Sequence, residues 1–199
     1  MQPGLVTHGK AILCAIDVET TGVIPGHHEI WQIAMVPVTV DLTPWDGPPF
    51  YVNVRPEYPE RASIQALRTC GITDEQFDAF PEQSVVEAQF YDWHANLGLP
   101  ADFRLLPLWH NGRFDESFLR VFFGDEAFDE LFTIPARDTF PICAFLNDQR
   151  AFRGQNAIFG RLTLELVAKR LGVDVRVSHD ALADCLTNIE VYRLLCEMF

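Results

Sequence analysis

The segment Ala11-Ile12-Leu13-Cys14-Ala15-Ile16-Asp17-Val18-Glu19 is the most informative stretch of the sequence. Its residues are apolar at both alternating positions until the acids begin, which is typical of a central β-strand covered on two faces. Because side chains alternate with a period of two, Asp17 and Glu19 project from the same face. Thr20-Thr21-Gly22 then ends the strand. Two acids side by side at the end of a buried strand can share a metal ion, although a strand that emerges into solvent would carry the same residues.

A second apolar run, 105–109, leads through His110-Asn111-Gly112 into a predicted helix. Phenylalanines at helical spacing mark the inner face of that helix: Phe114, Phe118 and Phe122. Asp115 therefore falls in the first helical turn. A carboxylate there complements the helix dipole by about 0.3–1 kcal/mol, which is a sufficient structural explanation. The neighbouring histidine and asparagine favour a functional role as well.

A third element joins a histidine to an acid near the C-terminus. Asp180 is the expected N-cap of a helix, which places His179 on the loop just outside it. Asp184 shares a helical stripe with apolar residues and so faces the body of the protein. A lone histidine near a helix start is more often a cap or a surface residue. Its position just before an inward-facing acid favours a chemical role.

The four acids, Asp17, Glu19, Asp115 and Asp184, together require a cation. Carboxylates that converge in apolar surroundings repel one another and lose hydration, so they stay ionised at neutral pH only when positive charge compensates them. Oxygen-only ligands favour Mg²⁺ or Mn²⁺ over zinc. The sequence therefore predicts a hard divalent metal site.

Three ordered segments carry a resemblance to a known family: Asp17-Val18-Glu19-Thr20-Thr21-Gly22, His110-Asn111-Gly112-Arg113-Phe114-Asp115 and His179-Asp180-Ala181-Leu182-Ala183-Asp184. They resemble the three motifs of the DnaQ-like, DEDDh family of 3′–5′ exonucleases. Weaker similarity is found at 70–73, 137–139 and 164–172, so it spans almost the whole chain. The resemblance implies an α/β fold of the ribonuclease H-like type, a mixed β-sheet flanked by helices.

The resemblance also implies roles for individual residues. Asp17, Glu19 and Asp184 would bind two divalent cations, Mg²⁺ or Mn²⁺, with Asp115 completing the site directly or through water. His179 would be the general base, because a histidine side chain, with an unperturbed pKa of about 6.5, can accept a proton at neutral pH. The remaining assigned residues would lie near the 3′-terminal nucleotide: Thr20, Thr21, Gly22, His110, Asn111 and Phe114.

Substrate identity stays open at this level. Gln32 stands where relatives often carry Glu, and the family includes polymerase proofreading subunits, oligoribonuclease, ribonuclease T and free-standing DNA exonucleases. The partner is a 3′ end of single-stranded DNA or RNA; a polymerase partner is compatible with the resemblance but nothing in the sequence indicates one, and the oligomeric state is open.

Net charge −13 and a pI near 4.7 oppose the binding of a polyanion. The charge is uneven, however, because residues 69–103 contain no Lys or Arg, whereas 149–161 contain three arginines and no acid. We expect 149–161 to be a loop in which Arg150 and Arg153 contact phosphates. Phe152 and Phe159 would stack on bases there or, equally, fold back into the core.

The 199 residues, 48% of them hydrophobic, predict one domain, 1–199. No segment reaches transmembrane length and the N-terminal residues lack a secretory pattern, so a cytoplasmic enzyme without membrane contact is expected. Five cysteines without CxxC spacing predict reduced thiols. Strands are expected near 11–18, 30–40, 49–54, 105–110 and 133–138. Helices are expected near 62–69, 82–97, 114–123, 161–171 and 180–197, and 44–49 as a hairpin loop.

The function favoured by these observations is metal-dependent hydrolysis of phosphodiester bonds from the 3′ end of a nucleic acid, with single-stranded DNA as the first expected substrate. One alternative is an oligoribonuclease-like enzyme that acts on short RNA, which a small acidic surface would suit. Another, from a different class, is a catalytically silent binding module of the same fold. The intact set of acids and His179 argue against the silent module.

Overall fold

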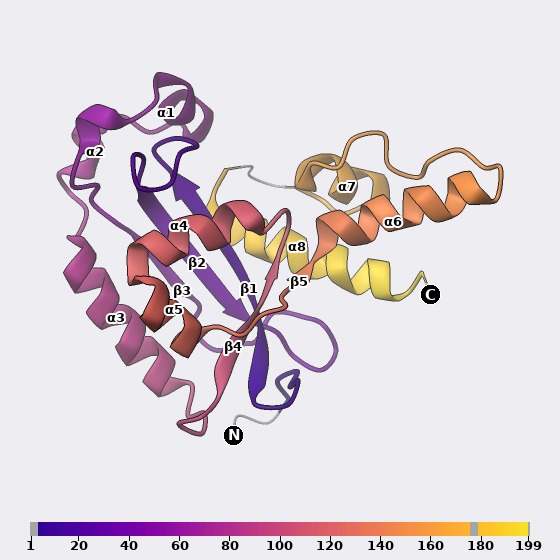
Figure 1. The fold of residues 1–199 in the computed structure, drawn as a ribbon, viewed down its shortest axis with the longest axis horizontal. Helices are drawn as coiled ribbons and strands as arrows, with labels where there is room; N and C mark the ends of the chain where they lie inside the picture. The colour runs from indigo at the N-terminus through magenta and orange to yellow at the C-terminus, as the bar shows by residue number, and fades with distance from the viewer. Residues whose placement is uncertain (1–3, 176–178, 199) are drawn as a thin grey trace.

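The computed structural model describes residues 4–175 and 179–198. Within them, five strands form one mixed sheet in the order β3-β2-β1-β4-β5 (Figure 1). The strands are β1 (Ala11–Thr20), β2 (Ile30–Pro37), β3 (Phe50–Asn53), β4 (Arg104–Trp109) and β5 (Arg137–Asp138). The pairs β1–β2 and β2–β3 are antiparallel, whereas β1–β4 and β4–β5 are parallel.

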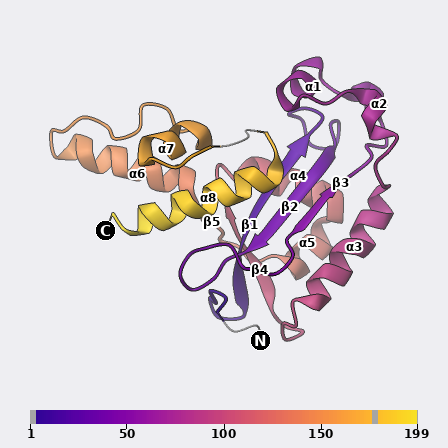
Figure 2. The same ribbon diagram turned by 180° about the vertical axis from the view of Figure 1, so that it is seen from behind.

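Helices lie on both sides of the sheet (Figures 1 and 2). One side carries α3 (Gln83–Asn96), α4 (Arg113–Phe123) and α5 (Asp125–Leu131), and the other side carries α8 (Ala181–Cys196). Two short helices stand beyond one end of the sheet, α1 (Ile64–Cys70) and α2 (Asp74–Phe77), after a 3₁₀ turn at Pro59–Arg61. The helices α6 (Thr139–Phe152) and α7 (Leu164–Leu171) pack on α8 and extend away from the sheet as a lobe.

Strand β1 connects the two sides of the molecule because its side chains alternate between them. Ile12, Cys14 and Ile16 pack in the core with α3, α4 and α5. Leu13 and Ala15 pack against α8. The period of two then carries Asp17 and Glu19 onto the α8 side, at the end of the strand. The sequence prediction of a strand buried on both faces is confirmed.

The mixed sheet flanked by helices confirms the expected fold class. All five strands are present near the expected positions, and 44–49 lie in the connection of the antiparallel pair β2–β3, as expected of a hairpin loop. All five cysteines are free. Among the helices of the described ranges, none is both long and apolar enough to cross a membrane.

The largest error of the sequence analysis is helix α6, for which no helix was expected. Residues 149–152 form its last turn, so the prediction of a loop over 149–161 is wrong in its first part. Pro141 lies in the first turn of α6, where its missing N–H would have no partner within the helix, so it does not interrupt the helix. Asp138 caps the helix by accepting the Phe140 N–H at 2.9 Å. Helix α5, also unexpected, follows α4 after a single glycine.

Candidate active site

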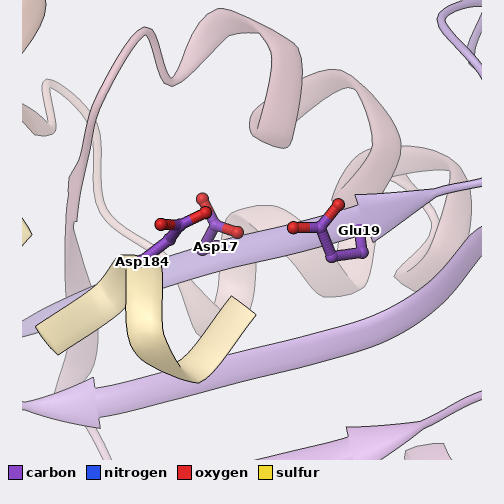
Figure 3. Close-up of side chains that lie close together, drawn as sticks. All are labelled: Asp17, Glu19 and Asp184. Carbon is purple, nitrogen blue, oxygen red and sulfur yellow. The ribbon is translucent and has the colours of Figure 1, made fainter. Parts of the chain in front are cut away.

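Three carboxylates meet where β1 passes beneath the start of α8. Asp17 and Glu19 project from β1, and Asp184 reaches toward them from the first turn of α8 (Figure 3). One ligand oxygen of each lies within 4.8 Å of those of the other two. The sequence-predicted acids thus come together from elements 165 residues apart, the interval between Glu19 and Asp184. Their hard oxygen donors fit a divalent cation such as Mg²⁺ or Mn²⁺.

Asp115 approaches the same place from the other side of β1. It is buried in the first turn of α4, and its Oδ1 accepts the Val18 N–H at 3.2 Å. Strand β1 pairs with β4 only as far as Ala15, so the backbone beyond that point is open to this contact. Asp115 is not one of the three acids whose ligand atoms lie within 4.8 Å of one another.

The cluster of acids is electrostatically strained when all its carboxylates are ionised. Burial raises the pKa of Asp17 well above its ordinary value, and the charges of Asp115, Asp184 and Glu19 raise it further. Burial likewise raises the pKa of Glu19 to about 7 and that of Asp115 to about 8. Burial raises the pKa of Asp184 to about 6, partly offset by the backbone and ring of His179. A bound cation would reverse this cost by stabilising the ionised forms.

His179 stands immediately before the N-cap of α8. Asp180 accepts the Ala183 N–H at 2.9 Å, which confirms the predicted cap. His179 itself is exposed and has a left-handed backbone, φ 62°, which is uncommon for a residue other than glycine. His179 lines a cleft of about 440 Å³ that Glu19 also lines.

The cleft receives only some of the residues expected near a nucleotide. Thr20, Gly22 and Phe114 line it. Arg150 and Arg153 lie instead at the end of α6 and do not line the cleft. Thr21, His110 and Asn111 do not line it either.

Thr21, His110 and Asn111 serve the local structure. The buried Thr21 hydroxyl accepts the Glu29 N–H at 2.9 Å. His110 bonds through its Nδ1 to the Thr139 hydroxyl at 2.8 Å and through its Nε2 to the Leu162 carbonyl at 2.5 Å, and burial lowers its pKa. The backbone N–H of Asn111 donates to Asp138 at 2.9 Å, which fixes the turn before α4.

Two cleft residues were missed by the sequence analysis. The Cys70 thiol donates to Glu19 Oε2 at 3.2 Å, so this side chain touches a predicted metal ligand. His28 lies under Gly22, where an added Cβ would come within 2.2 Å of the imidazole. A thiol at the start of the weakly matched 70–73 segment and a histidine in a turn carry little signal in a sequence.

A hydrogen-bond network docks the start of α8 on the sheet. Gln32 Oε1 accepts the Ala181 N–H at 2.9 Å, while its Nε2 donates to Asn53 Oδ1 at 2.9 Å and to the Tyr51 hydroxyl at 3.2 Å. Tyr51 in turn donates to Asp180 Oδ2 at 2.5 Å. An amide can accept and donate at once, whereas a carboxylate cannot donate. The glutamine that departs from the family pattern therefore fits the partners that this chain provides.

The family model RNase_T, described as an exonuclease model, matches residues 14–192. The chain belongs to this DnaQ-like exonuclease family. Its ribonuclease H-like fold and its three converging acids agree with that membership. No curated protein sequence matches the chain.

Solved structures share the fold at low sequence identity. Exonuclease I matches with a TM-score of 0.72 and 20% identity over 93% of this chain and 40% of that one. The cell-death related nuclease CRN-4 matches with a TM-score of 0.66 and 18% identity over 94% of this chain and 64% of that one. Exonuclease I from Methylocaldum szegediense has a TM-score of 0.69 and 22% identity, with 93% and 40% covered. The chain thus spans less than two thirds of the length of these proteins.

The raised carboxyl pKa values predict how the stability of the metal-free protein depends on pH. The folded form holds protons on these carboxyl groups that the unfolded form releases above about pH 4. The stability that the protonated groups give to the folded form is therefore fully present below about pH 4 and is lost as pH rises toward 8. In chelator, the melting temperature should fall between about pH 5.5 and 8, and Mg²⁺ or Mn²⁺ should raise it more at the higher pH. Asp17→Asn should flatten both trends. A metal-induced shift that is equal at both pH values would contradict the assignment.

The docking network predicts a graded loss of stability. Gln32→Met leaves the buried Ala181 N–H without its acceptor and should lower the free energy of unfolding by about 1–3 kcal/mol. Tyr51→Phe removes only one hydroxyl at the edge of the network and should cost about 0.5–1.5 kcal/mol. Urea unfolding of both variants measures the difference. Equal stability of Gln32→Met and the wild type would show that the network does not hold α8.

Proposed function

We propose that the protein is a metal-dependent 3′–5′ exonuclease that hydrolyses phosphodiester bonds at the 3′ end of single-stranded DNA. The observation that carries this proposal is the meeting of Asp17, Glu19 and Asp184 beside the cleft that His179 lines, in a chain of the exonuclease family. A silent binding module would have no need for three converging carboxylates with a fourth buried acid beside them.

The metal-binding residues of the proposal are Asp17, Glu19 and Asp184, with Asp115 supporting them directly or through water. Two divalent cations bound there would supply Lewis acidity to the scissile phosphate and to water. Cys70 donates to Glu19 and thereby restrains the carboxylate that faces the cleft. Asp115, bonded to the Val18 N–H, restrains β1 between the two acids of that strand.

His179 is the proposed general base. An imidazole nitrogen at the mouth of the cleft accepts the proton of the attacking water, and the exposed ring can pass that proton to solvent. The network of Gln32, Tyr51 and Asp180 holds the helix start on which this residue depends. The base and Asp184 are therefore positioned by the same docked element.

The substrate-binding part of the proposal has two regions. In the cleft, the backbones of Thr20 and Gly22 and the Phe114 ring contact the terminal nucleotide, while the buried Thr21 supports that loop and His110 and Asn111 support the turn that precedes α4. At the end of α6, Arg150 and Arg153 contact phosphates beside Phe152, a residue that is 92% exposed. Phe159 is buried in the core and is not available to stack.

Single-stranded DNA is proposed because Exonuclease I, which shares the fold, is described in complexes with single-stranded DNA and with dA16. A panel of 3′-labelled DNA and RNA, single- and double-stranded and of several lengths, tests the choice with Mg²⁺ or Mn²⁺ present. Stepwise shortening of single-stranded DNA from the 3′ end is the expected result. Preferential cleavage of short RNA would replace DNA by RNA as the substrate.

Replacing Asp17 tests the metal centre. Asp17→Asn keeps the size of the side chain but removes a charged metal ligand, so turnover should be lost while the protein stays folded. Asp102→Asn, which changes an exposed acid paired with Lys10, is the matched control and should retain activity. The proposed centre is wrong if purified Asp17→Asn cleaves DNA at the wild-type rate.

Replacing His179 tests the base. His179→Ala should lower kcat by about 10²–10⁴ with little change in metal affinity, because the residue moves a proton and is not proposed as a ligand. Metal-induced stabilisation measured by thermal melting provides the second readout. Loss of metal binding would make His179 a ligand, and an unchanged rate between about pH 6 and 8 would remove it from the mechanism.

A further inference from the structure

A cationic groove lies on the lobe, outside the cleft. It has a volume of about 440 Å³ and is lined by Gly160, Arg161, Leu166, Lys169 and Arg170. Three of these five residues are cations, and no acid lines the groove. None of its residues lines the active-site cleft.

Helical spacing builds one wall of the groove. Val167 and Ala168 bury one face of α7 against α6 and α8. Leu166, Lys169 and Arg170 consequently lie on the outer face, since residues three and four apart share a side of a helix. The Arg170 Nε donates to the Ile158 carbonyl at 3.0 Å, which ties the helix to the loop that supplies Arg161.

Several cations outside this region are paired with acids. Lys10 pairs with Asp102, Arg120 with three acids, and Arg193 with Glu190 and Glu197. In the described ranges, no carboxylate is paired with Arg161, Lys169 or Arg170. Residues 149–172 contain five cations and a single acid. In a protein of net charge −13, this concentration of uncompensated positive charge indicates an anion-binding surface.

Helix α7 packs on α8 (Figure 2), and Glu165 in its first turn contributes to the raised pKa of Asp184. A strand whose 3′ end occupies the cleft therefore has a cationic surface within reach along α7. Guanidinium groups match phosphate oxygens in two-point contacts, and the partly exposed Leu166 offers an apolar contact for a sugar or base.

We propose that the groove formed by Arg161, Lys169 and Arg170 binds backbone phosphates of the nucleic acid strand on the 5′ side of the nucleotide held in the cleft. This proposal rests on the proposed exonuclease function and adds a third contact region to it, beside the cleft and the end of α6. Because the net charge repels a polyanion at long range, affinity depends on short-range contacts that release counterions. The groove supplies such contacts outside the active-site cleft, so its positive charges are not placed among the metal ligands.

The test compares two double variants that remove the same charge. Arg161→Gln with Lys169→Gln changes the groove but leaves Arg170, which also bonds the backbone of Ile158. Lys10→Gln with Arg104→Gln is the matched control, since both residues are exposed at the beginnings of β1 and β4, the far ends of the strands from the acids. Binding of fluorescent single-stranded DNA is measured by anisotropy in chelator over a salt series, so no strand is cut.

The groove variant should raise Kd several-fold and reduce the slope of log affinity against log salt by about 0.7 for each phosphate that the groove no longer binds, about 1.4 for two. The control should change neither. The groove variant should also raise KM on long oligonucleotides while it leaves hydrolysis of a thymidine 5′-phosphate nitrophenyl ester unchanged. Kd and salt slope equal to those of the control would overturn the proposal.

A single-residue variant separates loss of DNA binding from a folding defect. The small ester substrate separates failure of the groove proposal from failure of the proposed exonuclease function. Lys169→Glu alone should weaken binding further than Lys169→Gln, so a folding defect of the double variant leaves the groove testable; equal binding by these two single variants would overturn it. If the wild type cleaves neither the ester nor any oligonucleotide, the proposed exonuclease function fails, whereas the chelator binding data still decide whether the groove holds DNA.

Discussion

The structure depends on one strand that is buried on both of its faces. Side chains of β1 alternate between the core under α3, α4 and α5 and the core under α8, so this strand ties the two layers together. The same alternation delivers Asp17 and Glu19 to the α8 side at the point where apolar packing ends. The acids are therefore placed by the packing of a rigid core, which holds them together although burial strengthens their mutual repulsion.

Polar networks supply the alignment that apolar packing leaves undetermined. Asp138 accepts three backbone N–H groups, those of Asn111, Gly112 and Phe140, and so joins the turn before α4 to the start of α6. Gln32 makes the corresponding connection between β2, β3 and α8. Asp138 and Gln32 therefore have hydrogen-bond partners on several elements. Small shifts of the helices that carry Asp115 and Asp184 would break several of these hydrogen bonds at once.

Much of this arrangement could be predicted from the sequence, because local signals agreed with the tertiary structure. The apolar run before Asp17 identified β1, and the position of Asp180 identified the start of α8. Helix α6 was missed because Pro141 is a helix breaker in most positions and is tolerated in a first turn. The contact of Cys70 with Glu19 and the use of His110 in a structural network depend on residues 29 to 52 apart in sequence, for which no local pattern exists.

Acidic and basic residues are concentrated on opposite sides of the molecule, so an electric field tends to orient it. The segment 69–103, which has acids and no Lys or Arg, includes α2 and α3 on one side, whereas the cations of 149–170 lie on the lobe at the opposite side (Figure 1). A body with this asymmetry carries a large dipole moment in addition to its net charge. Near a polyanion it experiences a torque that turns the lobe toward the polyanion and the acidic side away, so encounters are selected for orientation even where net repulsion makes them less frequent.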